Sequence, residues 1–203
     1  MRRRTWDGAE RGVALLVTLL MLVAVLLLGA SASTMALLGE QAARAERDRL
    51  IAFQAAEDAL MDAERDIESG RSPADPPATP PAQPAPQARS PAWQLVDLAS
   101  DATTPFGVLS GAVMETGEGF EPFRRPRYLA ERLPRPGGGF FYRVTVIGFG
   151  SRSDTEVVLQ STYRRAADAP PGASGPSGRL SWREIANWRE LHAAARAGRE
   201  EKP

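Results

Sequence analysis

Residues 13–39 read VALLVTLLMLVAVLLLGASASTMALLG, and this stretch sets the class of the protein. No charged side chain interrupts it, and a helix rising about 1.5 Å per residue would span the roughly 30 Å hydrocarbon core of a bilayer. It also contains no proline, so its main-chain hydrogen bonds can all form within the segment, as lipid requires. The sequence therefore predicts one continuous transmembrane helix.

The short segment before this helix is basic. It carries Arg2, Arg3, Arg4 and Arg11. Basic residues beside an apolar helix favour the cytoplasmic side of the membrane. Residues 1–12 are therefore expected in the cytoplasm, and the chain after residue 39 is expected in the periplasm, with the helix in the inner membrane.

Glu10, Arg11 and Gly12 stand directly before the apolar run, and this placement resembles a class III, or prepilin, signal. The resemblance implies that prepilin peptidase cuts between Gly12 and Val13, that Val13 is then N-methylated, and that the helix is retained. Glycine suits a scissile site because it lacks a Cβ atom. Typical major pilins carry glutamate at the fifth mature position, where this chain has Val17, which argues against a major, repeating subunit.

Two other interpretations of the apolar segment remain open. A secretory signal peptide would end at the small residues 30–32, whereas a plain single-span anchor would keep its leader. Either would make the rest of the chain a membrane-anchored or secreted periplasmic binding domain. The apolar pattern continues beyond residue 32 as far as Leu38, which is unusual for a signal peptide.

Residues 40–69 are expected to continue the helix in amphipathic form. One apolar stripe recurs at spacings of four and three, and its members are Phe53, Ala56, Leu60, Ala63 and Ile67. The charged side chains between them, including Asp62 and Asp66, are expected to form a solvated face of the helix. Gly70 and Pro73 are expected to end the helix.

The remaining chain is predicted to hold a small antiparallel sheet. Residues 70–92 are rich in proline and alanine and are expected to form an extended connector. Two alternating runs, 140–147 and 155–163, predict a β-hairpin. Tyr142, Val144 and Val146 should share one face of the first strand, as Val157, Leu159 and Tyr163 should in the second. The helix stripe is the expected cover for this face.

The C-terminal part is predicted to be a linker, residues 166–178, followed by an amphipathic helix. Ser181 and Glu184 have the spacing of a capping box that would start this helix. Its apolar side would carry Trp182, Ile185, Trp188 and Leu191. These four side chains are expected either to dock on their own domain or to contact a partner subunit.

No pattern in the sequence indicates chemistry. There is no cysteine, and His192 is the single histidine. The net charge is zero with interspersed signs, so nucleic acid is not expected as a partner. We find no nucleophile elbow or phosphate-binding loop. The sequence predicts no enzymatic activity, no cofactor and no metal site.

Arg47-Asp48-Arg49, followed by AFQAAE at residues 52–57, is similar to the signature of the PilX family, the minor pilins of type IV pilus assembly. The segments 126–128 and 178–184 are also similar. The resemblance implies an α+β, type IV pilin-like fold in which a long N-terminal helix packs on a small antiparallel sheet. It also implies a minor pilin that primes assembly in a tip-proximal complex and supports twitching motility and adhesion.

The partners that the resemblance implies are other minor pilins and pilin helices, a pilus-tip adhesin, the inner-membrane assembly platform, prepilin peptidase and membrane lipid. A minor pseudopilin of a type II secretion system shares the same features and remains the alternative. The expected division of the chain is a leader at 1–12, a membrane or filament-core helix at 13–39, its amphipathic continuation at 40–69, a connector at 70–92, a β-rich domain at 93–165, a linker at 166–178 and a helix with tail at 179–203.

Overall fold

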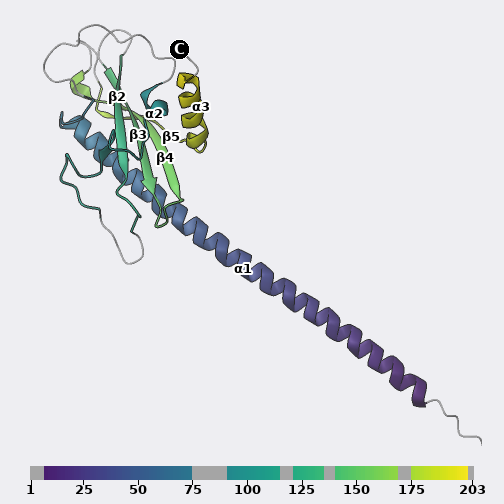
Figure 1. The fold of residues 1–203 in the computed structure, drawn as a ribbon. Coiled ribbons are helices and arrows are strands. Elements are labelled where there is room, and N and C mark those ends of the chain that lie inside the picture. The colour runs from purple at the N-terminus through teal and green to yellow at the C-terminus, as the bar shows by residue number, and fades with distance from the viewer. Residues whose placement is uncertain (1–6, 75–90, 115–120, 135–139, 169–174, 201–203) are drawn as a thin grey trace, which may run out of the picture. The chain divides into compact units, whose positions relative to one another are not determined.

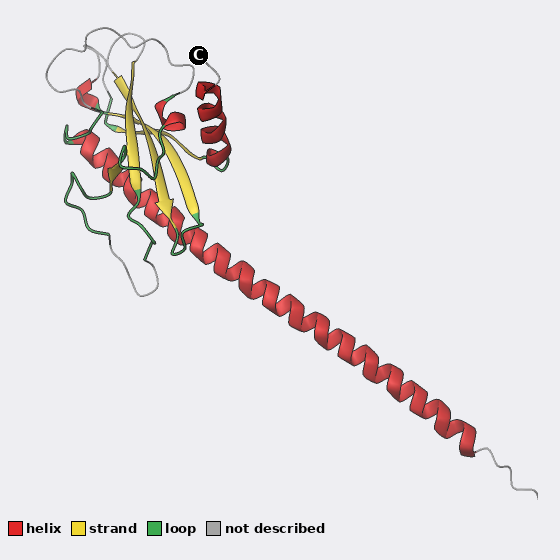
Figure 2. Cartoon of the chain, viewed as in Figure 1, coloured by secondary structure: helices red, strands yellow, loops and turns green. Residues whose placement is uncertain are grey.

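A computed structural model describes residues 7–74, 91–114, 121–134, 140–168 and 175–200 (Figures 1 and 2). It confirms the α+β, pilin-like class. In chain order the elements are α1 (Asp7–Glu68), α2 (Ala92–Leu95), β1 (Thr104–Pro105), β2 (Arg127–Pro134), β3 (Phe140–Phe149), β4 (Glu156–Arg164), the 3-10 turn η1 (Ala166–Asp168), β5 (Gly178–Glu184) and α3 (Trp188–Glu200). The chain divides into two compact units, Met1–Glu46 and Arg47–Pro203.

In the second unit, the apolar stripe of α1 forms the centre of the core. Ala56, Leu60, Ala63 and Ile67 have no exposed surface, and Phe53 packs half-buried at the edge. Four alanines, at positions 52, 56, 59 and 63, belong to this core, so the sheet can approach the helix backbone closely. The helix and one sheet face thus form a continuous apolar layer.

The C-terminal end of α1 is closed by a Schellman motif at Gly70. Gly70 has a φ of +70°, which glycine adopts without a Cβ penalty. Its N–H donates to the Ile67 carbonyl at 3.1 Å, and the Arg71 N–H donates to the Asp66 carbonyl at 2.9 Å. The helix therefore ends where the sequence predicted.

The described strands form one antiparallel sheet in the order β1-β2-β3-β4-β5. The predicted hairpin is confirmed as β3 and β4, with Tyr142 opposite Tyr163 and Val146 opposite Leu159. The predicted inward face is also confirmed, because these residues pack against α1 with Val144. The rest of the sheet adds β1 and β2 on one side and β5 on the other.

The prediction that a helix starts at Ser181 is wrong. Residues 178–184 form β5, which pairs with β4 so that Trp182 lies opposite Ser161 and Glu184 opposite Leu159. The capping-box pattern is a local signal, and here the non-local pairing with β4 overrides it. The helix begins only at Trp188. The predicted linker also contains η1, while most of the proline-rich connector lies outside the described residues.

The other face of the sheet carries a second apolar core beneath α2 and α3 (Figure 1). Its buried members are Trp93, Leu98, Ile147, Phe149, Val158, Ile185 and Trp188. Ile147 and Val158 come from β3 and β4, on the side away from α1. The second unit is therefore built in three layers, α1, the sheet, and the pair α2 and α3.

Helix α1 and the sheet approach each other closely at Gly148. A Cβ atom there would lie 2.1 Å from the Ala52 carbonyl oxygen and 2.5 Å from the Ala56 nitrogen. Gly148→Ala should therefore lower the free energy of unfolding by about 2–3 kcal/mol, because helix and strand must separate. Urea denaturation of the detergent-solubilised chain, followed by tryptophan fluorescence, measures this change.

Gly178→Ala is the matched control, because a Cβ atom at Gly178 meets nothing within 4 Å. This variant should stay within about 0.5 kcal/mol of the parent chain. Equal unfolding free energies for the two variants would contradict the close packing of β3 on α1.

Candidate functional site

The apolar part of α1 is the first candidate surface. By length and composition it can cross a membrane, with a mean hydropathy of 3.0 over its most apolar window, and none of that window is buried. Leu20, for example, is 62% exposed. In water so large an apolar surface is strongly unfavourable, so it requires lipid or other helices around it.

The polar side chains within this apolar segment are satisfied internally. Each of its four hydroxyl groups donates to a main-chain carbonyl three or four residues earlier, at 2.9–3.0 Å: Thr18 to Leu15, Ser31 to Leu27, Ser33 to Gly29 and Thr34 to Ala30. No water is needed to complete these hydrogen bonds. The segment is therefore suited to an environment without water.

The predicted processing residues lie in the exposed N-terminal part of α1. A Cβ atom built at Gly12 would meet nothing within 4 Å, and Val13 is 65% exposed. Both residues belong to the continuous helix that begins at Asp7.

In the second unit, a seam of polar contacts joins α1 to β5. Arg49 donates twice to the Glu184 carboxylate at 2.9 Å. The Trp182 indole N–H donates to Glu57 at 2.6 Å, and its ring meets Phe53 edge to face with centroids 6.1 Å apart. The seam fixes β5, the edge strand that the sequence reading missed, along one side of the helix.

A second set of contacts ties two loops and strand β2 to α1 through three buried aspartates. Asp48 accepts from the Ser151 N–H at 2.6 Å and from its hydroxyl at 2.5 Å. Asp62 accepts from the Gly107 N–H at 2.7 Å.

The third aspartate, Asp66, accepts from the Tyr128 hydroxyl at 2.6 Å. All three are at most 4% exposed, so the prediction of a solvated face is wrong for Asp62 and Asp66. They lie roughly 100–140° around the helix from the centre of the apolar stripe, so the periodicity of the stripe does not locate them.

The pKa values of two of these carboxylates, Asp48 and Asp66, are shifted in opposite directions. Burial acts to raise the pKa of Asp48, but hydrogen bonds from Ser151, Thr155 and the main chain outweigh it, and the pKa is lowered. For Asp66, burial dominates over the hydrogen bond from Tyr128 and raises the pKa. Asp48 is therefore held as a carboxylate by its loop, whereas Asp66 lies where charge is disfavoured.

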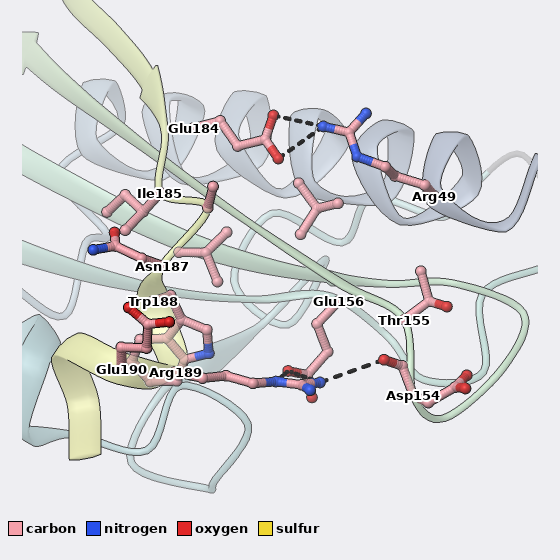
Figure 3. Close-up of a pocket in the computed structure, with 13 residues that line it drawn as sticks. Arg49, Asp154, Thr155, Glu156, Glu184, Ile185, Asn187, Trp188, Arg189 and Glu190 are labelled. Atoms are coloured by element: carbon pink, nitrogen blue, oxygen red, sulfur yellow. Dashed lines mark hydrogen bonds and ion pairs between the residues drawn. The ribbon is translucent and has the colours of Figure 1, made fainter. Parts of the chain in front are cut away.

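A cavity of about 520 Å³ opens between the end of β5, the start of α3 and the turn before β4 (Figure 3). Arg49 and Glu184 form one side, and Arg189 lies across from them, where it donates to Glu156 at 2.9 Å. Val157, Val158, Ile185 and Trp188, which are all buried, also line it. The cavity thus combines buried apolar residues with charged residues.

The four residues predicted as candidate partner contacts have different positions in the structure. Ile185 and Trp188 are buried in the second core, and Leu191 packs half-buried against it. Trp182 is 43% exposed. His192 is half-buried, with its Nδ1 atom 2.8 Å from the Gln94 carbonyl oxygen.

Among the described residues, no group of three or more histidine, cysteine, aspartate or glutamate side chains is placed to hold a metal ion. What the described residues do present is an apolar helical surface, a helix clamped to a sheet, and a charged cavity. A long N-terminal helix with an apolar part and an amphipathic part packed on an antiparallel sheet defines a type IV pilin-like protein.

Two family models match the chain, PilX N-terminal over residues 11–60 and Type IV pilus assembly protein PilX C-term over residues 70–165. The chain therefore belongs to the PilX family of type IV pilus assembly proteins. Comparisons with curated proteins and with solved structures found no match. β5 and α3 lie beyond both matched ranges.

The lowered pKa of Asp48 gives a pH-dependent prediction. Its stabilising effect is complete above the unfolded pKa of about 4 and is lost as pH falls through the lower folded pKa. Asp48→Asn should therefore cost about 2 kcal/mol of unfolding free energy at neutral pH, through loss of charge-assisted hydrogen bonds. Urea denaturation at a series of pH values should show this cost shrinking below about pH 4.

Asp66→Asn is the informative comparison, because the pKa of Asp66 is raised, whereas that of Asp48 is lowered. The folded state binds a proton at Asp66 more readily than the unfolded state, so the parent chain gains stability from this group as pH falls. The advantage of the parent over Asp66→Asn should therefore grow on acidification. The same pH trend in both variants would refute the assignment.

Proposed function

We propose that this protein is a minor pilin that primes or promotes type IV pilus assembly in a tip-proximal complex, and that it thereby supports twitching motility and adhesion. It acts through helix packing and not through catalysis. The observation that carries the proposal is the uncovered apolar part of α1, which belongs to a chain of the PilX family. Such a surface needs a non-aqueous partner.

Two environments can cover this surface in turn. After insertion, residues 13–39 lie in the inner membrane, with the leader in the cytoplasm and the second unit in the periplasm. During assembly, the helix leaves lipid and packs among other pilin helices. Because both environments are apolar, the exchange conserves most of the hydrophobic burial. The internally bonded hydroxyl groups incur no penalty in either environment.

Processing prepares the helix for this exchange. Prepilin peptidase removes residues 1–12 by cutting between Gly12 and Val13, and Val13 is then N-methylated. Removal of the leader takes away Arg2, Arg3, Arg4 and Arg11, which otherwise hold the N-terminus at the cytoplasmic face. The helix that remains begins with an apolar residue and can be extracted.

The neighbours of the assembled protein are other minor pilins, pilin helices and a pilus-tip adhesin, and the inner-membrane assembly platform receives it before extraction. Val17 stands where major pilins carry glutamate, which supports a place outside the repeating part of the filament. The family match favours the pilus over a type II secretion system as the setting.

Processing can be tested directly by mass spectrometry of the mature N-terminus. The expected result is a chain that begins with N-methylated Val13. Gly12→Val should abolish cleavage, because a branched side chain at the scissile position obstructs the peptidase. Gly29→Val is the control, since a Cβ atom at Gly29 also meets nothing within 4 Å, and it should be processed normally. An intact Met1 in cells with active prepilin peptidase would overturn the proposal, and a mature chain starting at Ser33 would indicate secretion instead.

Assembly can be tested with the deletion strain. Loss of the protein should reduce surface pili and twitching motility while exoprotein secretion continues. Complementation with Leu20→Arg should fail, because a central arginine disfavours the apolar helix by about 2.5–3.5 kcal/mol in membrane insertion. Leu20→Ile is the control and should restore pili. Loss of exoprotein secretion with normal pili would assign the protein to a type II secretion system.

A further inference from the structure

Strand β5 is a free edge of the sheet. Among the described residues it pairs with β4 alone, and residues 179–183 are all exposed. The main-chain N–H and C=O groups on its outer side therefore point away from the sheet, where they can pair with a further strand. Pairing with β4 is regular over residues 181–184 and shifts register at Leu180, so these four residues form the regular part of the edge.

The charged side chains of β5 do not protect this edge. Proteins commonly block a free edge with charged groups that lie across it. Here Arg179 donates to a glutamate of α1 at 2.7 Å, and Arg183 donates to a glutamine of β4 at 2.6 Å, so both guanidinium groups are turned back onto the fold. The apolar side chains of the strand, Leu180 and Trp182, are instead 50% and 43% exposed.

The face of α1 beside β5 is apolar and uncovered. Successive strands contact α1 at positions that advance around it: β2 bonds to Asp66, β3 lies against Ala56, and β5 bonds to Glu57. At about 100° per residue, these positions are about 80° and about 100° apart in one direction. Leu50 and Met61 lie about 20° and about 40° beyond Glu57 in that same direction. Both are exposed, so the next strand of the sheet would lie over two uncovered apolar side chains.

We propose that β5 is extended by a β-strand from a different subunit of the pilus. The main chain of that strand pairs with residues 181–184, and its side chains on the α1 side are apolar and cover Leu50, Met61 and Trp182. In such strand addition, main-chain hydrogen bonds supply affinity and alternate side chains supply specificity. This inference rests on the proposed function, since it requires a neighbouring subunit.

The geometry argues against a second copy of this chain as the donor of the strand. Antiparallel pairing of two β5 strands about a two-fold axis would make the two α1 helices run in opposite directions, whereas copies anchored in one membrane share a direction. Parallel pairing would place the two α1 helices on opposite faces of the joined sheet. Leu50 and Met61 would then meet the second copy's Ser181 and Arg183, which are polar and alternate with Trp182. A different subunit has neither constraint.

Photocrosslinking of the full-length protein in piliated cells tests the inference. p-Benzoylphenylalanine replaces the exposed Leu180, and the captured peptide is identified by mass spectrometry. The expected capture is a segment of another pilus subunit with apolar residues at alternate positions. Met61→Glu should lower the yield about tenfold, because the added strand would remove this carboxylate from water without a partner.

Val113→Glu is the matched control. Val113 is also an exposed apolar residue, but it lies between β1 and β2, at the opposite edge of the sheet, so the yield should not change. Met61→Leu keeps an apolar side chain and should retain capture. The inference would be overturned by an unchanged yield in Met61→Glu, by an equal loss in Val113→Glu, or by capture of a peptide from this chain.

Disulfide formation distinguishes strand pairing from other kinds of contact. The chain contains no cysteine, so Ser181→Cys introduces a single thiol. Cysteines placed one at a time along the captured segment should crosslink most strongly at one position and more weakly two residues away, because opposite Cβ atoms in paired strands are about 4.5–5.5 Å apart and diagonal neighbours about 7–8 Å. Crosslinks that recur at every third or fourth position would show a helix instead and would exclude strand addition.

A second photoreactive position separates this inference from the proposed function. p-Benzoylphenylalanine at Leu20 reports packing of the apolar helix against other pilin helices. If Leu20 captures pilin helices and Leu180 captures nothing, strand addition fails while the proposed function stands. If neither position captures a pilus subunit, the proposed function fails and strand addition fails with it.

Discussion

The close contact between α1 and β3 is the constraint on which the rest of the second unit depends. Gly148 brings strand backbone onto helix backbone at Ala52 and Ala56, where no side chain larger than a methyl group intervenes. This contact sets the distance between the sheet and the helix. The larger residues Leu60 and Ile67 then fill the space further along, and the close packing leaves few alternative arrangements.

Apolar packing is not directional, so it does not by itself fix where each loop meets the helix. The three buried aspartates fix these positions, because hydrogen bonds require specific donors at specific places. Asp48 binds the turn before β4, Asp62 binds the loop before β2, and Asp66 binds the Tyr128 side chain on β2. A displacement of the sheet by one helical turn would leave a buried carboxylate without donors, which costs several kcal/mol. We infer that these contacts select a single register.

The parts of the fold that could be predicted from the sequence are those with a local signal. The apolar segment, the helix stripe and the β3–β4 hairpin each follow from periodicity within a short window. β5 could not be predicted in this way, because Ser181 and Glu184 imitate a helix start and only pairing with β4 reveals the strand. The buried aspartates could not be predicted either, because they lie beside the apolar stripe and their donors come from segments that are distant in the sequence. The cavity requires β5, so it could not be located either.

The two parts of α1 meet different physical requirements. Residues 13–39 satisfy their hydroxyl groups within the helix and contribute no residue to either apolar core, since both cores consist of residues from position 52 onward. In the part after residue 47, each of the three buried aspartates accepts a hydrogen bond from a donor on its own sheet or loops. The folded unit therefore does not depend on what surrounds the apolar part. Under the proposed function, the helix exchanges lipid for neighbouring helices while the packing of the sheet remains unchanged.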